Sequence, residues 1–381
     1  MRILHCCLSN YYVDRFAYQE NELVAAQIRE GHEVVVIAST ETFGADKSIT
    51  YLEPSDYLGS DGARVIRLPY RRFCPKKLMR KLRMHPGVAK TIESFKPDTI
   101  LFHGTCGWEL ITVSNYVKRH PDVRLYVDSH EDYNNSARNF ISKWLLHFLY
   151  YRTVVRYCSR WIKKILCVNI DSMLFLQDLY GLKAQQLEFF PLGGRIFHDD
   201  EYKRLRQLAR EKLGFDDSEI VFLQSGKINR SKKLLQSLLA FREISEGKFR
   251  FIIAGTLEQD VDNEAQEIIA SDSRIRHLGW LNPEELQSVL CAADIYVQPG
   301  TQSATMQMSL CCRCAIVIDD NNSHKPYLKA NGWLINSDAS LKNAFREIAA
   351  SPDIIKVMSE NSALLAAELL DYRKLSKRIC V

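Results

Sequence analysis

Residues 225–241 read SGKINRSKKLLQSLLAF, a basic segment that follows a predicted buried strand at 220–224 and leads into a predicted helix. Gly226 would let the backbone approach a ligand closely, and Lys227 and Lys232 could each donate charge-assisted hydrogen bonds. Because parallel sheets bind ligands at the carboxyl ends of their strands, this position suits a diphosphate. A solvated basic loop is the alternative. The segment contains neither a Walker motif nor G-x-G-x-x-G, which disfavours ATP and dinucleotides.

Short apolar strands alternate with longer helical segments through the rest of this half of the chain. Strands are predicted at 220–224, 249–254, 275–278, 295–297 and 315–318, and helices at 233–244, 262–269, 283–292 and 305–311. Such an order indicates a parallel sheet with helices on both faces. Asp260 and Asp262 resemble a metal-binding D-x-D pair, but we predict that an aspartate caps the helix beginning at 262.

The N-terminal half shows the same alternation until PLGG, at 191–194, interrupts it. Strands are predicted at 2–8, 33–38, 99–102, 124–128, 165–168 and 187–190, and helices at 20–29, 108–118 and about 139–164. A chain of 381 residues exceeds what one hydrophobic core usually organises. We therefore predict two α/β doubly wound domains, 1–195 and 196–365, with a C-terminal helix at 366–381 that crosses back to the first domain.

The composition limits the classes of function. With 46% hydrophobic and 25% charged residues the chain has a globular composition, and no apolar run approaches the ~20 residues of a spanning helix. The start, MRILHCCLSNYYVD, is predicted to be a strand and not a signal peptide, which favours a cytoplasmic location. The eleven cysteines indicate reduced core thiols, and the cluster at 311–314 lacks zinc-ligand spacing, so no metal is predicted. A net charge of +5 is small for a protein that binds nucleic acid, and none is predicted.

Two basic segments bear on membranes. Residues 143–164 alternate aromatic and basic side chains at helical spacing, which favours an anionic lipid surface. The second segment, residues 71–83, has almost no acidic residue, and its candidate contacts are Arg71, Arg72, Lys76, Lys77 and Arg80. We predict peripheral contact with the inner face of the membrane. The alternative is that the aromatic face packs in the domain core and the basic face is solvated.

Several motifs resemble, in sequence order, the landmarks of one enzyme family. They are MRILHCC, REGHEVVVIAS, FKPDTILFHG, VDSHED, CVNIDSM and FFPLGG in the first half, and SGKINRSKKLLQSLLAF, FIIAGTLEQ, IRHLGWLNPEELQSVLCAADIYVQPG and NGWLI in the second. Over most of the chain the sequence is similar to the retaining family-4 glycosyltransferases of the GT-B fold. The resemblance implies two Rossmann-like doubly wound domains facing a central cleft, the N-terminal one binding the acceptor and the C-terminal one the nucleotide-sugar donor.

The resemblance assigns the basic segment to the donor diphosphate. Lys227 stands where the family usually has arginine, and Lys232 stands at its lysine, so both would neutralise the leaving group. Fixed cations there are worth most in the transition state, when charge develops on the diphosphate. Further donor contacts are implied for Gly226, Gly255, Trp280 and Leu281, with a core position as the alternative for Trp280. No cofactor is implied, because the nucleotide-diphosphate sugar is a co-substrate.

The family's E-x7-E element is replaced in this sequence. Residues 299–307 read PGTQSATMQ, without a carboxylate, and Gln307 falls at the second glutamate position. A glutamine amide can still bond ribose hydroxyls, and the helix start can still offer backbone N–H groups to phosphate or sugar oxygens. The residues implied at that helix start are Gln302, Ser303, Ala304 and Thr305. A polar residue on a packed helix is the alternative for Gln307.

His130, in the DSHED segment at 128–132, resembles the family's cleft histidine that contacts the transferred sugar. Its place at a strand's carboxyl end beside two carboxylates supports a functional role. The first loop, 10–18, lacks the glycine pair of the family, so acceptor recognition should differ from the type. The candidate acceptor contacts are Tyr18, Gln19, Glu20, Glu131 and Asp132.

The predicted function is metal-independent, hexosyl-type glycosyl transfer with retention, from a nucleotide-diphosphate sugar to a glycan or lipid-linked glycan in surface polysaccharide biosynthesis. In such transfer the phosphate oxygen itself is thought to deprotonate the acceptor, so no protein base need be found. The missing glutamates leave open a catalytically inactive nucleotide-sugar-binding or membrane scaffold protein. A nucleotide-sugar epimerase shares the architecture, but no clear set of cleft carboxylates supports it.

Overall fold

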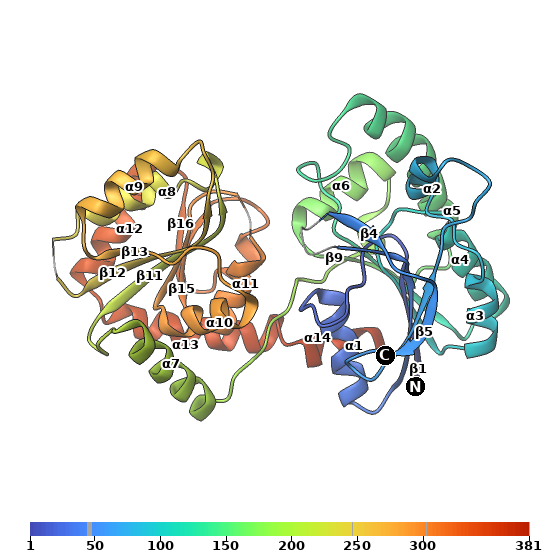
Figure 1. Cartoon of the computed structure of the whole chain (residues 1–381), viewed down its shortest axis with the longest axis horizontal. Coiled ribbons are helices and arrows are strands. Elements are labelled where there is room, and N and C mark those ends of the chain that lie inside the picture. The colour runs from blue at the N-terminus through green and yellow to red at the C-terminus, as the bar shows by residue number, and fades with distance from the viewer. Residues whose placement is uncertain (44–47, 246, 302, 381) are drawn as a thin grey trace. The chain divides into compact units, whose positions relative to one another are not determined.

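The chain forms two compact units in the computed structural model (Figure 1). The structure describes residues 1–43, 48–245, 247–301 and 303–380. Unit 1 contains Met1–Pro191 and Tyr372–Val381, and unit 2 contains Leu192–Asp371. Phe190 is buried in unit 1 and its N–H donates to the Cys167 carbonyl, whereas the Gly194 N–H donates to the Leu370 carbonyl in unit 2. The chain therefore leaves one unit and enters the next within PLGG.

Unit 1 is built on an eight-stranded sheet of order β10-β9-β8-β7-β1-β2-β6-β5, in which only the β5–β6 pair is antiparallel. Its strands are β1 Arg2–Cys7, β2 Glu33–Ser39, β5 Ser55–Leu58, β6 Arg64–Leu68, β7 Thr99–Phe102, β8 Arg124–Ser129, β9 Lys164–Cys167 and β10 Leu187–Phe189. A separate antiparallel pair joins β3 Glu41–Phe43 to β4 Ile49–Tyr51. The helices are α1 Gln19–Arg29, α2 Lys76–Leu82, α3 Val88–Phe95, α4 Glu109–Arg119, η1 Ser142–Tyr151, α5 Arg152–Cys158, α6 Ile170–Tyr180, η2 Ala184–Gln186 and α14 Tyr372–Cys380.

The helix predicted at about 139–164 is wrong in its type and its end. Residues 142–151 form a π-helix, η1, which continues as α5 only to Cys158. The chain must then turn, because Lys164 already begins the buried strand β9. No helix among the described residues combines the length and the apolar content that crossing a bilayer requires.

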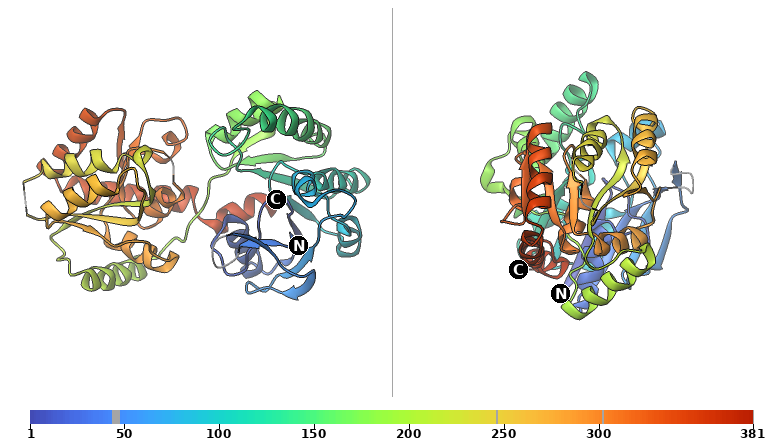
Figure 2. Two further views of the ribbon diagram at one scale, coloured as in Figure 1. Left: turned by 45° about the horizontal axis from the view of Figure 1, so that its top comes forward. Right: turned by 90° about the vertical axis from the view of Figure 1, so that its left-hand side faces the viewer.

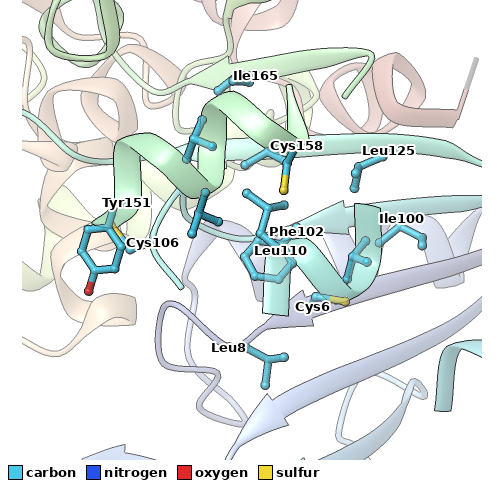
Figure 3. Close-up of a cluster of buried hydrophobic side chains, with 14 of the residues drawn as sticks. Cys6, Leu8, Ile100, Phe102, Cys106, Leu110, Leu125, Tyr151, Cys158 and Ile165 are labelled. Carbon is cyan, nitrogen blue, oxygen red and sulfur yellow. The ribbon is translucent and has the colours of Figure 1, made fainter. Parts of the chain in front are cut away.

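The largest core of unit 1 lies on the face of the sheet covered by α4 and α5 (Figure 3). Phe102 of β7 and Leu110 of α4 are completely buried there. The sulfurs of Cys6 and Cys158 pack among the apolar side chains, where a thiol behaves as a small apolar group. All eleven cysteines are free.

Unit 2 is built on a six-stranded parallel sheet of order β13-β12-β11-β14-β15-β16. The strands are β11 Ile220–Ile228, β12 Phe249–Leu257, β13 Ile275–His277, β14 Ile295–Gln298, β15 Ala315–Asp319 and β16 Gly332–Ile335. The helices are α7 Asp199–Leu213, η3 Arg230–Lys232, α8 Leu234–Arg242, α9 Asp262–Ser271, α10 Pro283–Ala292, α11 Ala304–Cys311, η4 Lys325–Tyr327, α12 Asp338–Ala350 and α13 Ile354–Leu369. Helices α8, α9 and α12 cover one face of the sheet, and α7 and α10 lie on the other (Figure 1).

The last helix, α14, belongs to unit 1 and packs beside α1 (Figure 2). Leu375 and Ile379 of α14 are buried against Leu23 of α1 and Leu101 of β7. The segment 366–381, predicted as one helix, begins within α13 and is interrupted before Tyr372.

We expect Leu375→Ala to destabilise unit 1 by ~2–4 kcal/mol, because it removes a fully packed side chain and leaves a cavity. The measurement is the urea midpoint of unfolding. Lys374→Ala, at an exposed position of the same helix, is the control and should leave the midpoint unchanged. Equal midpoints for the two variants would show that α14 does not contribute to the core.

Candidate functional site

The strand order of unit 2 reverses between β11 and β14, and the two loops at the carboxyl ends of these strands meet. The Thr301 N–H donates to the Ser231 carbonyl (3.2 Å), and Lys232 Nζ donates to the Thr301 carbonyl (2.8 Å). A Cβ at Gly300 would lie 2.0 Å from the Ser231 carbonyl oxygen. The loops can therefore touch only because position 300 has no side chain.

Gly226 and Gly255 lie side by side, because β11 continues through 226 and 227 to Ile228. The prediction that this strand ends at 224 is therefore wrong. Both glycines have positive φ, 126° and 138°, and a Cβ at Gly255 would lie 1.8 Å from the Gly226 carbonyl oxygen. A Cβ at Gly226 would meet nothing within 4 Å. The space beside Gly226 is thus open to a ligand that contacts the backbone.

The two predicted catalytic lysines have different surroundings. Lys232 is half-buried, and burial lowers its pKa below the ordinary lysine value. Lys227 is 73% exposed, and its Nζ lies 3.4 Å from Glu258 Oε1. The structure thus fixes Lys232 at the meeting of the two loops and leaves Lys227 on their solvent side.

The prediction that an aspartate caps α9 is wrong. Val261 occupies the N-cap position, where no side chain makes a capping bond, and Asp262 is the first helical residue. Asp260 instead accepts a hydrogen bond from the Arg230 N–H (3.0 Å). Its carboxylate therefore holds the lysine-bearing loop.

The start of α11 presents short polar side chains. The Thr305 N–H donates to Ser303 Oγ (3.3 Å), and Ala304 is exposed. Gln302, the other predicted contact, lies outside the described residues. Gln307 is buried and its Nε2 donates to the Tyr327 hydroxyl (3.0 Å), while its Oε1 has no partner among the described residues. Gln307 thus has one amide oxygen left to accept a hydrogen bond.

Trp280 and Leu281 follow Gly279, whose carbonyl is hydrogen-bonded to the backbone of Gly255. The Gly255 N–H donates to the Gly279 carbonyl (2.7 Å). Trp280 is 61% exposed, so the alternative of a core position does not hold, and Leu281 is half-buried.

Sequence reasoning missed the polar end of β14. Gln298 and His324 are buried and their Nε2 atoms are 3.3 Å apart, while Gln298 Oε1 has no partner in the part of unit 2 that the structure describes. A glutamine that ends the apolar strand IYVQ was the available signal.

In unit 1 the strand order reverses between β1 and β7, and the other candidate residues follow β1 and β8, the neighbour of β7. The Ser9 hydroxyl donates to the Cys106 carbonyl. A Cβ at Gly104 would lie 2.8 Å from Ser9 Cβ. As in unit 2, a glycine lets two loops meet at the reversal.

Glu131 and Asp132 are engaged within the protein. Glu131 accepts hydrogen bonds from the Ser129 hydroxyl (2.6 Å) and the Thr105 N–H (3.3 Å). Asp132 Oδ1 accepts from the N–H groups of the two asparagines at 134 and 135, at 2.8 and 3.0 Å. Both carboxylates therefore shape the loops around His130, and their predicted contact with hydroxyls of a ligand stays a prediction.

His130 lies above a buried polar chain that sequence reasoning also missed. Its Nε2 is 3.9 Å from Asp128 Oδ1, and 40% of its side chain is exposed. Asp128 Oδ2 is 2.5 Å from His103 Nδ1, and His103 Nε2 is 2.9 Å from His5 Nδ1. Two histidines within apolar strand segments, in ILHCC and ILFHG, were the signal.

The three candidates at the start of α1 differ in exposure. Glu20 is buried, accepts a hydrogen bond from Asn10 Nδ2 (2.7 Å), and has a raised pKa, chiefly because of burial. Gln19 is buried and its Nε2 donates to the Pro191 carbonyl (3.3 Å). Tyr18 is 42% exposed and is the most accessible of the three.

Two family profiles together match most of the chain. The glycosyl transferase 4-like domain matches residues 19–193, and glycosyl transferases group 1 matches residues 206–364. The α-galactosylglucosyldiacylglycerol synthase of Streptococcus pneumoniae (strain ATCC BAA-255 / R6) is 19% identical over 228 residues. That alignment covers 56% of this chain and 60% of the relative, so the chain matches less than two thirds of that protein's length.

Solved structures share the fold. The sucrose-phosphate synthase of Thermosynechococcus elongatus has a TM-score of 0.68 at 14% identity, over 100% of this chain and 97% of the other. HepE from Anabaena, in complex with UDP, has a TM-score of 0.66 at 15% identity, over 100% and 98%. A glycosyltransferase from Rickettsia africae has a TM-score of 0.67 at 12% identity, over 99% and 96%. These likenesses show a GT-B fold with two Rossmann-like parallel sheets.

We expect inorganic diphosphate to bind unit 2 less tightly as the pH rises, before an exposed lysine would lose its charge. Burial lowers the pKa of Lys232, so the cation that meets the anion is lost at a lower pH than usual. Calorimetric titration of wild type and Lys232→Arg across the alkaline range measures this, because arginine stays charged and cancels the probe's own titration. Parallel affinity curves for the two proteins would contradict a binding role for Lys232.

Proposed function

Because the chain belongs to the group 1 retaining glycosyltransferases, we propose that it transfers a sugar from a nucleotide-diphosphate donor to a glycan or lipid-linked glycan in surface polysaccharide assembly. In this proposal unit 2 binds the donor and unit 1 binds the acceptor. The observation that carries it is the pairing of Lys232 with the Thr301 carbonyl at the strand-order reversal of unit 2, beside the open backbone of Gly226.

The chemistry follows from charge at that reversal. Transfer breaks the bond between the anomeric carbon and a phosphate oxygen, and negative charge develops on the departing diphosphate. Lys232 is already held in place by one hydrogen bond, so little reorganisation is needed when that charge appears. The phosphate oxygen takes the acceptor proton on the same face of the sugar, which gives retention without a protein base.

The relatives support the donor and acceptor classes. HepE has been crystallised with UDP-glucose, and the pneumococcal relative is named as a synthase of a glycosylated diacylglycerol. We therefore propose a UDP-sugar as the first donor to test and a lipid-linked acceptor as the first acceptor.

The second candidate, an inactive nucleotide-sugar-binding or membrane scaffold protein, rests on position 307. Gln307 is buried against the Tyr327 hydroxyl where the family has a carboxylate. A panel of UDP-, GDP- and ADP-sugars with a membrane extract separates the two functions. Nucleotide release marks an enzyme, whereas nucleotide binding without release of product marks the scaffold.

We expect Lys232→Ala to lower kcat by ~10²–10³ with the fold intact, the effect of removing one preformed transition-state donor. The measurement is nucleoside diphosphate release with the best donor of the panel, together with the circular dichroism spectrum. Lys212→Ala, at an exposed position on α7, is the matched control. A kcat within about threefold of wild type would remove the role assigned to Lys232.

Membrane contact is a further part of the proposal, and both predicted basic segments bear on it. Lys76 Nζ lies 3.2 Å from the centre of the Tyr51 ring, and Arg80 pairs with Glu41 at 2.5 Å. The other three predicted cations, at 71, 72 and 77, are exposed. Tyr151 of η1 is buried in the core, which agrees with the alternative that the aromatic face packs inside the domain. Other apolar side chains of this helix are exposed. Those exposed side chains, here called the η1 face, are Phe140, Ile141, Trp144, Leu145 and Leu149.

We expect Leu145→Ser with Leu149→Ser to reduce sedimentation with anionic phosphatidylserine vesicles by at least ~10-fold, because each leucine loses several inserted CH₂ equivalents. Reversing the charge of Arg71, Arg72 and Lys77 should reduce it on anionic vesicles alone. Leu239→Ser, an exposed leucine of unit 2, is the control. Unchanged sedimentation of both variants would remove the membrane proposal.

A further inference from the structure

Unit 1 buries a chain of polar side chains between α1 and the sheet, directly beneath His130. Gln27 of α1 contacts His5 of β1, His5 contacts His103 at the end of β7, and His103 contacts Asp128 of β8. The four residues are at most 1% exposed. The chain crosses the strand-order reversal of unit 1, since His5 and His103 come from the strands on its two sides.

The hydrogen bonds determine the protonation of each ring. Gln27 Oε1 can only accept, so His5 Nε2, 2.7 Å away, carries a proton. Burial, and then the charge of His103, lower the pKa of His5 to about 3, so this ring is neutral and its Nδ1 accepts from His103 Nε2. Because His103 also donates from Nδ1 to the Asp128 carboxylate, both of its nitrogens carry protons. The chain thus ends in a buried imidazolium–carboxylate pair.

The charges around His103 favour this state. Burial opposes its charge, but Cys7 and Asp128 raise its pKa well above the ordinary value. The Cys7 thiol has a raised pKa because of burial and stays neutral, so Asp128 is the charge that matters. Burial also opposes ionisation of Asp128, yet His103 lowers its pKa. Among the described residues, Glu20 of α1, Cys167 of β9 and His130 also face the pair.

The second oxygen of Asp128 faces His130. Its Oδ2 accepts the hydrogen bond from His103 Nδ1, and its Oδ1 accepts the Gly104 N–H (2.7 Å) while lying 3.9 Å from His130 Nε2. That Nε2 is buried and has no hydrogen-bond partner among the described residues. A buried N–H beside a carboxylate is stabilised by pointing at it, so Asp128 favours the ring with its proton on Nε2.

We propose that Asp128 is a positioning residue that fixes the tautomer and orientation of His130, and that His103, His5 and Gln27 hold Asp128 charged and in place. The proposal rests on the proposed function and on the predicted contact of His130 with the transferred sugar. A buried ion pair seldom adds stability over apolar packing, so its location beneath His130 points to a role in the reaction.

The first test measures the rings themselves and needs no catalytic activity. In protein labelled with 15N-histidine, the nitrogens of the ten rings are assigned with single His→Gln variants. At neutral pH we expect His103 to be doubly protonated and His5 neutral. At mildly alkaline pH, His130 should favour the Nε2-protonated form by roughly 10-fold more than in Asp128→Asn, the effect of one charge-assisted interaction. A neutral His103, or an unchanged His130 tautomer in Asp128→Asn, would overturn the proposal.

The second test is a double-mutant cycle on donor turnover. Asp128→Asn should lower kcat by ~10–100-fold, as removal of a residue that orients a site histidine does, with the donor KM changed less than about threefold. Adding His130→Ala to Asp128→Asn should then cost little more, because the two residues act as a unit.

His85→Gln is the matched control, since it removes another buried imidazole of unit 1, whose Nδ1 lies within hydrogen-bond distance of the carbonyls of residues 68 and 69. Its effect should be small and should multiply with that of His130→Ala. If Asp128→Asn fails to fold, Gln27→Met tests the same series of hydrogen-bonded side chains from its far end. In that variant His103 should no longer be doubly protonated. Multiplicative effects of Asp128→Asn and His130→Ala would overturn the proposal. A wild type that turns over no donor would instead refute the proposed function and leave the NMR result standing.

Discussion

The reversal of strand order within each sheet is the constraint on which the site depends. In such a parallel sheet, the loops that follow the two strands at the reversal run to opposite faces of the sheet. The adjacent carboxyl ends of these strands leave a crevice that can hold a ligand. In unit 2 the reversal brings Lys232 to Thr301, and in unit 1 it brings Ser9 to the loop at 104–107.

Much of the fold could be predicted from the sequence, because buried parallel strands are short apolar runs separated by helical periodicity. The strands β5 and β6 were missed because serine, aspartate and arginine interrupt their apolar residues, so neither strand forms a continuous apolar run. Arg67 shows the reason. It is 2% exposed, yet it reads as a surface residue, since its guanidinium is satisfied by the carbonyls of Tyr12 and Ser39. Tertiary hydrogen bonds of this kind leave no trace in local periodicity.

The candidate site was predictable in part, for a related reason. Glycines and lysines at a strand end indicate phosphate binding through local properties, and sequence can report these. The partner of a carboxylate is a tertiary fact. The sequence indicated Asp260 as a helix cap, whereas the structure shows it bonded to the Arg230 N–H. The sequence indicated Glu131 as a ligand contact, and the structure shows its carboxylate bonded to residues of two loops. The histidine chain needed four separate elements to be brought together before it could be recognised.

The closely packed glycines at the strand-order reversal of unit 2 also limit which substitutions the protein can tolerate. Gly255 and Gly300 cannot accept even a methyl group without backbone collision, so this part of the surface is closed to variation by single substitution. The first turn of α11 is less constrained, because Ala304 is exposed and Gln307 Oε1 has no hydrogen-bond partner among the described residues. In the function proposed above, the diphosphate contacts would therefore stay fixed while the sugar contacts at the start of α11 vary.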